Sequence, residues 1–266
     1  MQAGRIAAIA LRHAYVIRRH PIRIAELVYW PLLDLLVWGF LGAYLESSSV
    51  GRTPAGTVLG TLVGGLILWD LLFRAQQGVS LAYLEEVWSR NLLNLFVSPL
   101  TLGEYLVGSL VVSCAKVAFS TVLMIGVAAL AYHFQLFSLG FALVPFVVCL
   151  LAMGWSIGIA TTAAILRHGQ GAENLAWAIA FLFQPFSAVF YPVTALPGWM
   201  QPIALALPST HVFEGMRAVL AGQPLPWKHV VTAAGLDVVM GLLAVGYFHV
   251  SFRQVRELGL LAKSGE

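Results

Sequence analysis

The sequence predicts an all-α membrane protein with six transmembrane helices. Of its 266 residues, 59% are hydrophobic and only 10% are charged, whereas soluble domains carry about 25% charged residues. A helix needs about 20 consecutive apolar residues to cross the bilayer core. The chain offers six windows of this kind, at 22–45, 57–80, 102–132, 138–166, 174–192 and 228–251. We therefore expect a single transmembrane domain over 1–266.

The placement of the basic residues predicts how these helices are oriented. With both termini in the cytoplasm, the opposite side holds only Arg52, Arg217 and Lys228. The cytoplasmic segments then hold Arg5, Arg12, Arg18, Arg19, Arg23, Arg74, Arg90, Arg167, Arg253, Arg256 and Lys263. Lys and Arg are enriched in cytoplasmic loops, so the bias favours six spans with both ends of the chain inside the cell.

Residues 1–20 are predicted to form an amphipathic helix on the cytoplasmic membrane surface. Three arginines at seven-residue spacing project from one side, and three apolar residues from another: Arg5, Arg12 and Arg19, then Ile6, Ala10 and Ile17. This pattern suits a helix at the level of the lipid headgroups. The alternative is a solvated basic tail.

The connection between the second and third spans predicts a second amphipathic helix, over 84–97. Its apolar residues recur every four positions and its charged residues occupy the other side: Leu84, Trp88 and Leu92, then Glu85, Glu86 and Arg90. Thr101 and Glu104 then form a capping box for the next helix. The 84–97 helix is either a docking element for a soluble partner or an anchor for its own loop.

Four prolines interrupt the apolar stretch that precedes the last span, at Pro192, Pro197, Pro202 and Pro208. Each removes a backbone donor and restricts the residue before it, so helix is expected only in pieces such as 198–207 and 209–220. Broken backbone at membrane depth is tolerated only where it is buried in protein or lines a wet cavity. We therefore expect residues 193–220 to close the outer end of a path.

Polar and aromatic side chains accompany this outer segment. His211, Glu214 and Arg217 follow one another at three-residue spacing. They are interpreted either as contacts for a polar headgroup or glycan, or as a mutually hydrogen-bonded cluster that fixes the segment. One His and one Glu do not make a metal site. Trp199 and Trp227 fit an aromatic belt at the outer interface.

Ionisable residues inside the predicted spans need a partner or water. Asp34, Lys116 and Asp237 are expected at one depth, roughly 18 to 21 Å from the cytoplasmic boundary, so Lys116 is predicted to pair with Asp34 or Asp237. Asp70 has a candidate partner in Arg74, four residues on. These charges either hold helices together or line a translocation path.

Two stretches of the chain resemble a known family. WSRNLLNLFVSPLTLGEYLVGSLV, from Trp88 to Val111, and FYPVTALPGWMQPIALALPSTHVFEGMR, from Phe190 to Arg217, look like the most recognisable segments of ABC-2 type transporter permeases. The resemblance implies a subunit of an inner-membrane exporter that dimerises and binds two cytoplasmic ATPases. ATP and Mg would be bound by those ATPases. It further implies that 84–97 is a coupling helix and that 193–220 is a re-entrant hairpin.

The motifs that the chain lacks limit the alternatives. GxxxxGK[ST], HExxH and a paired-cysteine motif are all missing, so we expect no catalytic site, no metal and no cofactor in this chain. One rival is a membrane-embedded enzyme acting on lipid or glycan, with His211 and Glu214 as acid and base. A second is a passive channel or scaffold. The cargo stays open among lipid-linked glycans, polysaccharides, lipids and hydrophobic drugs, as does the choice of homodimer or heterodimer.

Overall fold

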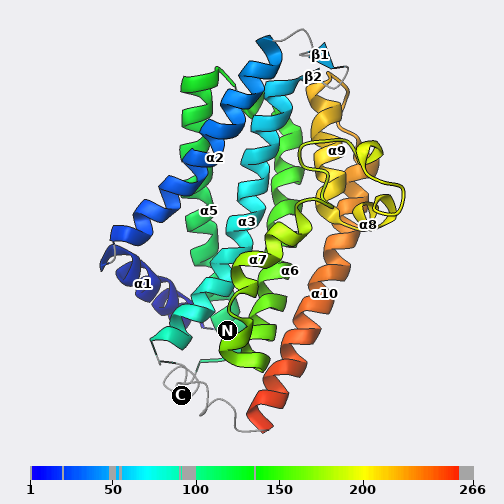
Figure 1. Ribbon diagram of the computed structural model, residues 1–266. Helices are drawn as coiled ribbons and strands as arrows, with labels where there is room; N and C mark the ends of the chain where they lie inside the picture. Colours follow the sequence, from blue (N-terminus) through cyan, green and yellow to red (C-terminus); the bar gives the residue numbers. More distant parts are fainter. Residues whose placement is uncertain are drawn as a thin grey trace.

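The protein is a helical bundle, seen in a computed structural model that describes residues 2–19, 21–47, 52–53, 56–89, 91, 100–134 and 136–257. Its long helices run roughly parallel to one axis (Figure 1). The end of the bundle that carries α1 and the last turn of α10 is called the lower end, and the opposite one the upper end. In chain order the elements are α1 (Ala3–Arg19), α2 (Pro21–Ser47), β1 (Arg52–Thr53), β2 (Gly56–Thr57), α3 (Val58–Trp88), α5 (Leu102–Tyr132), η1 (Leu136–Ala142), α6 (Leu143–His168), η2 (Gly169–Ala172), α7 (Leu175–Phe183), η3 (Val193–Ala195), α8 (Gln201–Leu205), α9 (Pro208–Leu220) and α10 (Trp227–Glu257).

Five of the described helices are long and apolar enough to cross a membrane, judged by length and composition. They are Ala25–Ser47, Val58–Trp88, Gly103–Tyr132, Leu139–His168 and Trp227–Glu257. The first amphipathic helix is also present, as α1. At the upper end, β1 and β2 form a short antiparallel pair between α2 and α3.

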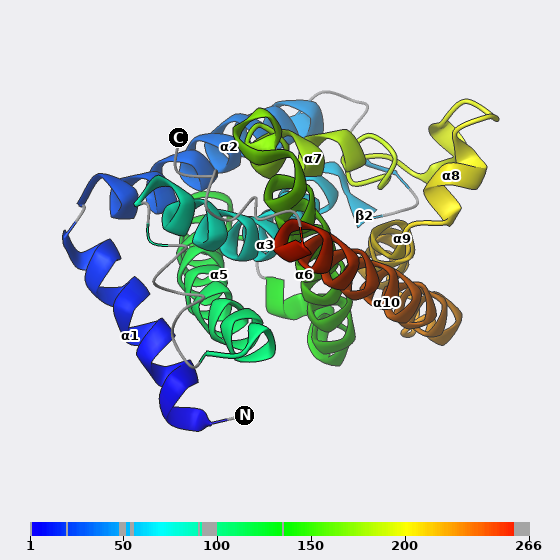
Figure 2. The same cartoon turned by 90° about the horizontal axis from the view of Figure 1, so that it is seen from below.

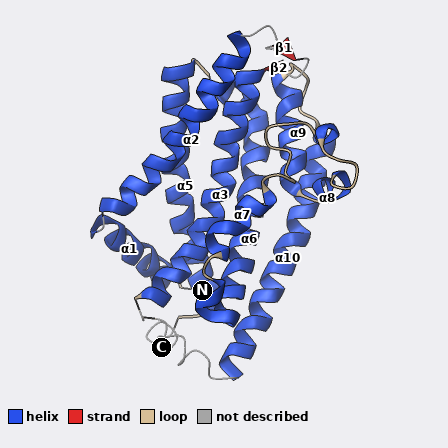
Figure 3. Cartoon of the chain, in the orientation of Figure 1, coloured by secondary structure: helices blue, strands red, loops and turns tan. Residues whose placement is uncertain are grey.

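The continuous span expected at 174–192 is not present. Its helix, α7, has only nine residues and is followed by turns. The passage from the lower to the upper end is made instead in two pieces, α7 below and α9 above, with irregular backbone and α8 between them (Figures 1 and 3). The 9 residues of α7 and the 13 of α9 are about 13 Å and about 20 Å long, so neither helix alone spans a core of about 30 Å.

Proline explains where the broken crossing is interrupted. Pro185 lies in the middle of the expected span, and α7 ends two residues before it. The predicted outer pieces are found as α8 and α9. α9 starts one residue before the predicted piece at 209–220, with Pro208 in its first turn and Leu207 as its N-cap without a side-chain cap bond.

The centre of the bundle is the contact between α3 and α6 (Figure 2). A Cβ on Gly154 would lie 2.5 Å from the Leu72 carbonyl oxygen, and one on Gly158 would lie 2.7 Å from that of Gln76. These glycines therefore let the two helices approach at backbone distance. In the most apolar 18-residue stretch of α3, 83% is buried inside the protein, whereas in that of α10 only 17% is buried. α3 is therefore central and α10 peripheral.

The separate helix expected at 84–97 is not seen over its first half. Residues 84–88 form the C-terminal end of α3, which runs from Val58 to Trp88 without a break. No proline interrupts 58–88, so the backbone hydrogen bonds of the second span continue past its predicted end at residue 80. Arg90, Leu92 and residues 93–97 of the predicted helix lie outside the described residues.

Candidate functional site

The lower end of the bundle is held together by ion pairs from α1. Arg12 pairs with Glu86, and His13 Nδ1 lies 3.3 Å from Glu85 Oε2, both near the end of α3. Glu86 is buried and Glu85 half-buried. These two predicted coupling residues thus face α1 rather than an open surface.

Glu104 joins α1 to α5. Its Oε2 accepts the backbone N–H of Thr101 at 2.9 Å, and its own N–H donates to Thr101 Oγ1 at 3.3 Å, which is the predicted capping box. Its Oε1 accepts the backbone N–H of Gln2 at 2.8 Å, and Arg5 lies 3.4 Å away. One carboxylate therefore starts α5 and docks the beginning of α1.

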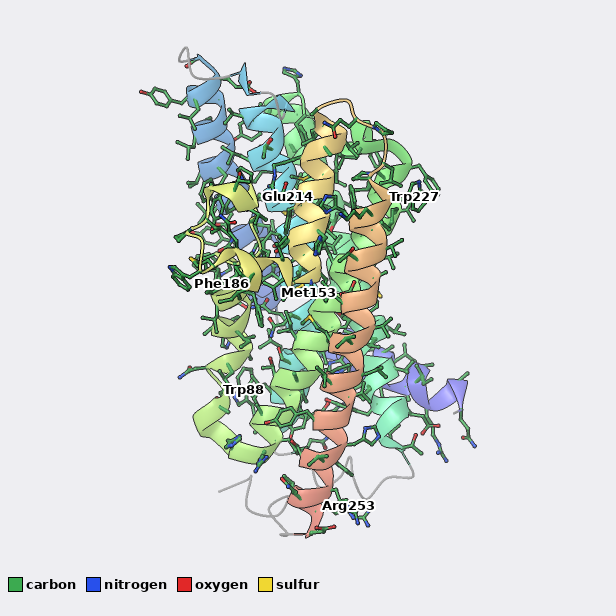
Figure 4. The ribbon with its side chains drawn as sticks, turned by 90° about the vertical axis from the view of Figure 1, so that its right-hand side faces the viewer. Trp88, Met153, Phe186, Glu214, Trp227 and Arg253 are labelled. Carbon is green, nitrogen blue, oxygen red and sulfur yellow. The ribbon has the colours of Figure 1, made fainter. Side chains whose placement is uncertain are left out.

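Trp88 is the most exposed of the four predicted coupling residues that the structure describes. Leu84 is fully buried, whereas Trp88 is 50% exposed. The Trp88 indole Nε1 donates to Glu173 Oε1 at 3.2 Å, across to the segment that leads into α7. Figure 4 shows Trp88 towards the lower end, beside that segment. The end of α3 and the base of the broken crossing are thus in direct contact.

A polar cluster lies midway along α2, α3 and α5. The predicted pair is present: Arg74 Nε donates to Asp70 Oδ1 at 3.2 Å. Ser120 Oγ from α5 donates to the other oxygen of Asp70 at 2.8 Å. Asp34 on α2 is exposed and lies within electrostatic range of Asp70 and Arg74. Arg74 is buried in this cluster, within α3, and its expected place on the cytoplasmic side stays a prediction.

Asp237 is buried on α10, apart from this cluster. Among the described residues, neither of its carboxylate oxygens accepts a hydrogen bond by distance and angle, although the Cys149 thiol on α6 is a neighbour. The predicted pairing of Lys116 with Asp237 is therefore not found. The pairing of Lys116 with Asp34 stays a prediction.

Near the upper end, Arg217 is the centre of a buried network. Its Nη1 donates to the Ala188 carbonyl at 2.9 Å, and its Nη2 lies 3.0 Å from Glu214 Oε1. The same Glu214 oxygen accepts the backbone N–H of Val193 at 2.7 Å. Two side chains of α9 thus hold the irregular backbone that precedes it.

His211 lies one turn before Glu214 on α9, and each of its two ring nitrogens lies near a polar atom. Its Nε2 lies 3.0 Å from the Leu205 carbonyl oxygen, and its Nδ1 lies 3.3 Å from His229 Nδ1 on α10. Along the irregular segment, Pro192, Pro197 and Trp199 are exposed, whereas Pro208 is buried. Only part of the predicted outer gate is therefore engaged in the bundle.

The ABC-2 type transporter family model matches residues 18–221, from the end of α1 to the end of α9. The chain belongs to the ABC-2 type transporter family. No curated protein matches this family member closely enough to count as a relative.

The structure of this ABC-2 protein also adds residues that the sequence analysis missed. Glu173 and His229 are two of these residues. Glu173 lies 85 residues after its partner Trp88, and His229 lies 18 residues after its partner His211, so no local spacing indicates either contact. Ser209 Oγ on α9 donates to Ser187 Oγ at 2.8 Å. In the part of the chain that the structure describes, no group of three or more His, Cys, Asp and Glu side chains is placed to hold a metal.

Proposed function

We propose that this ABC-2 permease is the membrane subunit of an ATP-driven exporter in a bacterial inner membrane. The family match across α2 to α9 carries this proposal, because it covers four of the five described helices that are long and apolar enough to cross a membrane. The permease works as a dimer with two separate ATPase subunits, which bind ATP and Mg at the lower end, in the cytoplasm. Its cargo is a lipid-linked glycan, polysaccharide, lipid or hydrophobic drug.

The contacts at the lower end support a mechanical route for coupling. α1 is ion-paired to α3 and α5, so a push on the end of α3 moves these helices together. Trp88 offers the exposed apolar surface that an ATPase cleft needs, and its bond to Glu173 extends the movement to the base of α7.

Packing along α3 supports a connection from this end to the outer gate. A Cβ on Gly65 would lie 2.9 Å from the Val189 carbonyl oxygen, so α3 touches the irregular backbone that Arg217 holds. A shift of α3 along its axis therefore displaces residues 188–190. We propose that this displacement opens the path beneath the 193–220 segment, and that Asp34 meets polar parts of the cargo.

The contacts of the outer residues do not favour the enzyme alternative. Glu214 is occupied by Arg217 and the Val193 N–H, and His211 by the Leu205 carbonyl. A general base must be within reach of a substrate proton. Glu214 and His211 already contact other groups of the protein, so they are poorly placed to act as a general acid and base.

The test is co-purification with an ABC ATPase encoded beside this gene and expressed with it. Charge reversal at Glu86 is a poor choice of variant, because it also breaks the Arg12 pair. We therefore expect Trp88→Ala to lose the ATPase. Trp227→Ala, which removes a somewhat more exposed tryptophan at the upper end, should keep it.

Glu173→Gln separates the two roles of Trp88, because it weakens the bond to the indole and leaves the exposed ring in place. We expect this variant to retain the ATPase. A wild-type protein that binds no ATPase in detergent or in lipid would contradict the proposal, and the channel or scaffold alternative would replace it.

A further inference from the structure

Two histidines meet edge to edge where α9 contacts α10. His211 is buried on α9, and His229 is half-buried in the first turn of α10. Their Nδ1 atoms are 3.3 Å apart, and their ring planes are inclined by 41°. Figure 4 shows the two helices side by side here, with Glu214 on α9 and Trp227 on α10 labelled near the upper end. The contact therefore joins the broken crossing to the last span.

The second nitrogen of His211 fixes how this contact is made. Nε2 lies 3.0 Å from the Leu205 carbonyl oxygen, which can only accept, so Nε2 carries the hydrogen of the neutral ring. The Nδ1 of His211 is then an acceptor, and the Nδ1 of His229 donates to it. One tautomer of each ring thus satisfies the contact with a single N–H···N hydrogen bond.

A first added proton leaves this hydrogen bond in place. The nitrogen of His229 that carries no hydrogen is Nε2, and protonation there gives a cation that still donates its Nδ1–H to His211. A hydrogen bond from a charged donor is stronger than one between neutral groups. With one added proton, α9 and α10 therefore stay joined.

A second proton has the opposite effect. It must go to the Nδ1 of His211, because the Nε2 of that ring already carries a hydrogen. Both Nδ1 atoms would then carry a hydrogen at a separation of 3.3 Å, with no acceptor between them, and two positive rings would face each other. The rings must therefore separate before the second proton binds.

The charged neighbours of the pair also oppose a second positive charge. Arg217 and Lys228 disfavour a cation at His229. Glu214 favours one, but its carboxylate is already paired with Arg217 at 3.0 Å. The surroundings therefore do not compensate for the repulsion between two protonated rings.

The other elements packed against the two helices bring little charge to this level. α6 contacts both helices, and its ionisable side chains are Cys149 in the upper half and Arg167 and His168 at the lower end. η1, α8, β2 and the part of α3 above Asp70 also contact α9 or lie beside it, and their sequences contain no ionisable residue. Protonation of the pair thus decides the electrostatics of this contact.

We propose that the hydrogen bond between His211 and His229 is an acid-sensitive latch. It joins α9 to α10 while the pair holds at most one added proton, and it opens when the second proton binds. α9 also holds the irregular backbone before it, through Arg217 and Glu214, so opening loosens the upper part of the broken crossing. The latch does not depend on the proposed transport function.

The experiment is thermal unfolding of the full-length protein in detergent from about pH 8 to about pH 5, the range in which histidine titrates. An unperturbed histidine gains its proton near about pH 6.5. Below that pH the unfolded state binds two protons at this pair and the folded state one. The unfolding equilibrium constant therefore rises about tenfold for each pH unit that the pH falls, through this pair alone.

His229→Gln removes this contribution. A glutamine amide offers both an N–H and an oxygen, so it satisfies the Nδ1 of His211 with or without its added proton. We expect the pH dependence of this variant to be shallower than that of the wild type by one proton. The matched control is His249→Gln on the same helix, because His249 is exposed and contacts the Val245 carbonyl of its own helix. It should keep the wild-type pH dependence.

NMR of the wild type keeps the test decisive if His229→Gln fails to fold. With nitrogen-15 histidine in lipid, we expect a signal across the N–H···N bond near about pH 7.5 and its loss near about pH 5. That loss, or a shallower pH dependence for His229→Gln alone, supports the latch. A signal that persists in acid or is missing at neutral pH overturns it, as does a His229→Gln variant as steep as the wild type, or a shallower dependence in both variants. None of these results bears on whether the ATPase co-purifies.

Discussion

α3 and the α7–α9 crossing traverse the same bundle in opposite ways. α3 is one helix of 31 residues whose backbone groups bond to one another along its length. The other crossing needs α7, α8 and α9 with irregular backbone between them. Because lipid offers no hydrogen bonds, that irregular backbone must find its partners inside the protein.

Side chains provide those partners. Each of the following hydrogen bonds joins a side chain to a backbone group in or beside the irregular segment: Tyr191 Oη to the Pro185 carbonyl, Gln201 to Leu196, Thr210 to Phe186, Arg217 to Ala188, and the Val193 N–H to Glu214. The polar residues of α9 thus do for this crossing what helical hydrogen bonds do for α3. The comparison teaches that a broken crossing is only as stable as its polar side chains.

The sharpest test of this comparison is Arg217→Met. The substitution leaves Glu214 and the Ala188 carbonyl without their buried partner, and removing one member of a buried ion pair costs about 3 kcal/mol or more. We expect a clear fall in thermal stability in detergent. Arg253→Met is the control, because the Arg253 side chain is 83% exposed in its pair with Glu257 and should change little. Equal effects of both would contradict the comparison.

A smaller effect is expected where α3 meets α6. Gly154→Ala forces a Cβ towards the Leu72 carbonyl, and overpacking of this kind costs about 1–3 kcal/mol. Gly126→Ala on α5 meets no atom within 4 Å and should be neutral or slightly stabilising. The measurement is the unfolding temperature of the two variants beside the wild type. A Gly126→Ala protein destabilised as much as the Gly154→Ala protein would contradict the assignment of the Gly154 effect to close packing.

The smallest effect is expected for Thr210→Val, which removes a single hydrogen bond to the Phe186 carbonyl. A bond of this kind contributes about 1 kcal/mol. Thr232→Val is matched to it, because the Thr232 hydroxyl donates to a carbonyl within its own helix that the helix can satisfy without it. Hydrogen exchange of residues 184–190 should rise for Thr210→Val alone. An increase in both variants would remove the distinction between the two kinds of crossing.

The features that could be predicted from the sequence depend on neighbours along one helix. The capping box of Thr101 and Glu104 and the Asp70 and Arg74 pair both rest on spacings of three or four residues. Such spacings fix relative position once a helix is assigned.

The features that were missed depend on contacts between helices. Glu85 and Glu86 carry no sign in the sequence that α1 will bind them, and nothing near His211 indicates His229. The broken crossing was also misjudged, because apolar composition predicts membrane burial but not helical continuity. Pro185 was the available signal for the break.

The two-piece crossing has a consequence for how the protein is made. A segment of nine apolar helical residues is too short to partition into a bilayer as a span, for which about 20 are needed. The Ala188 carbonyl and the Val193 N–H, in the irregular backbone that follows it, find their side-chain partners only after α9 has folded against them. We therefore expect the backbone between α7 and α9 to be completed only when α9 packs against it, later than that of the continuous helix α3, whose backbone groups bond to one another.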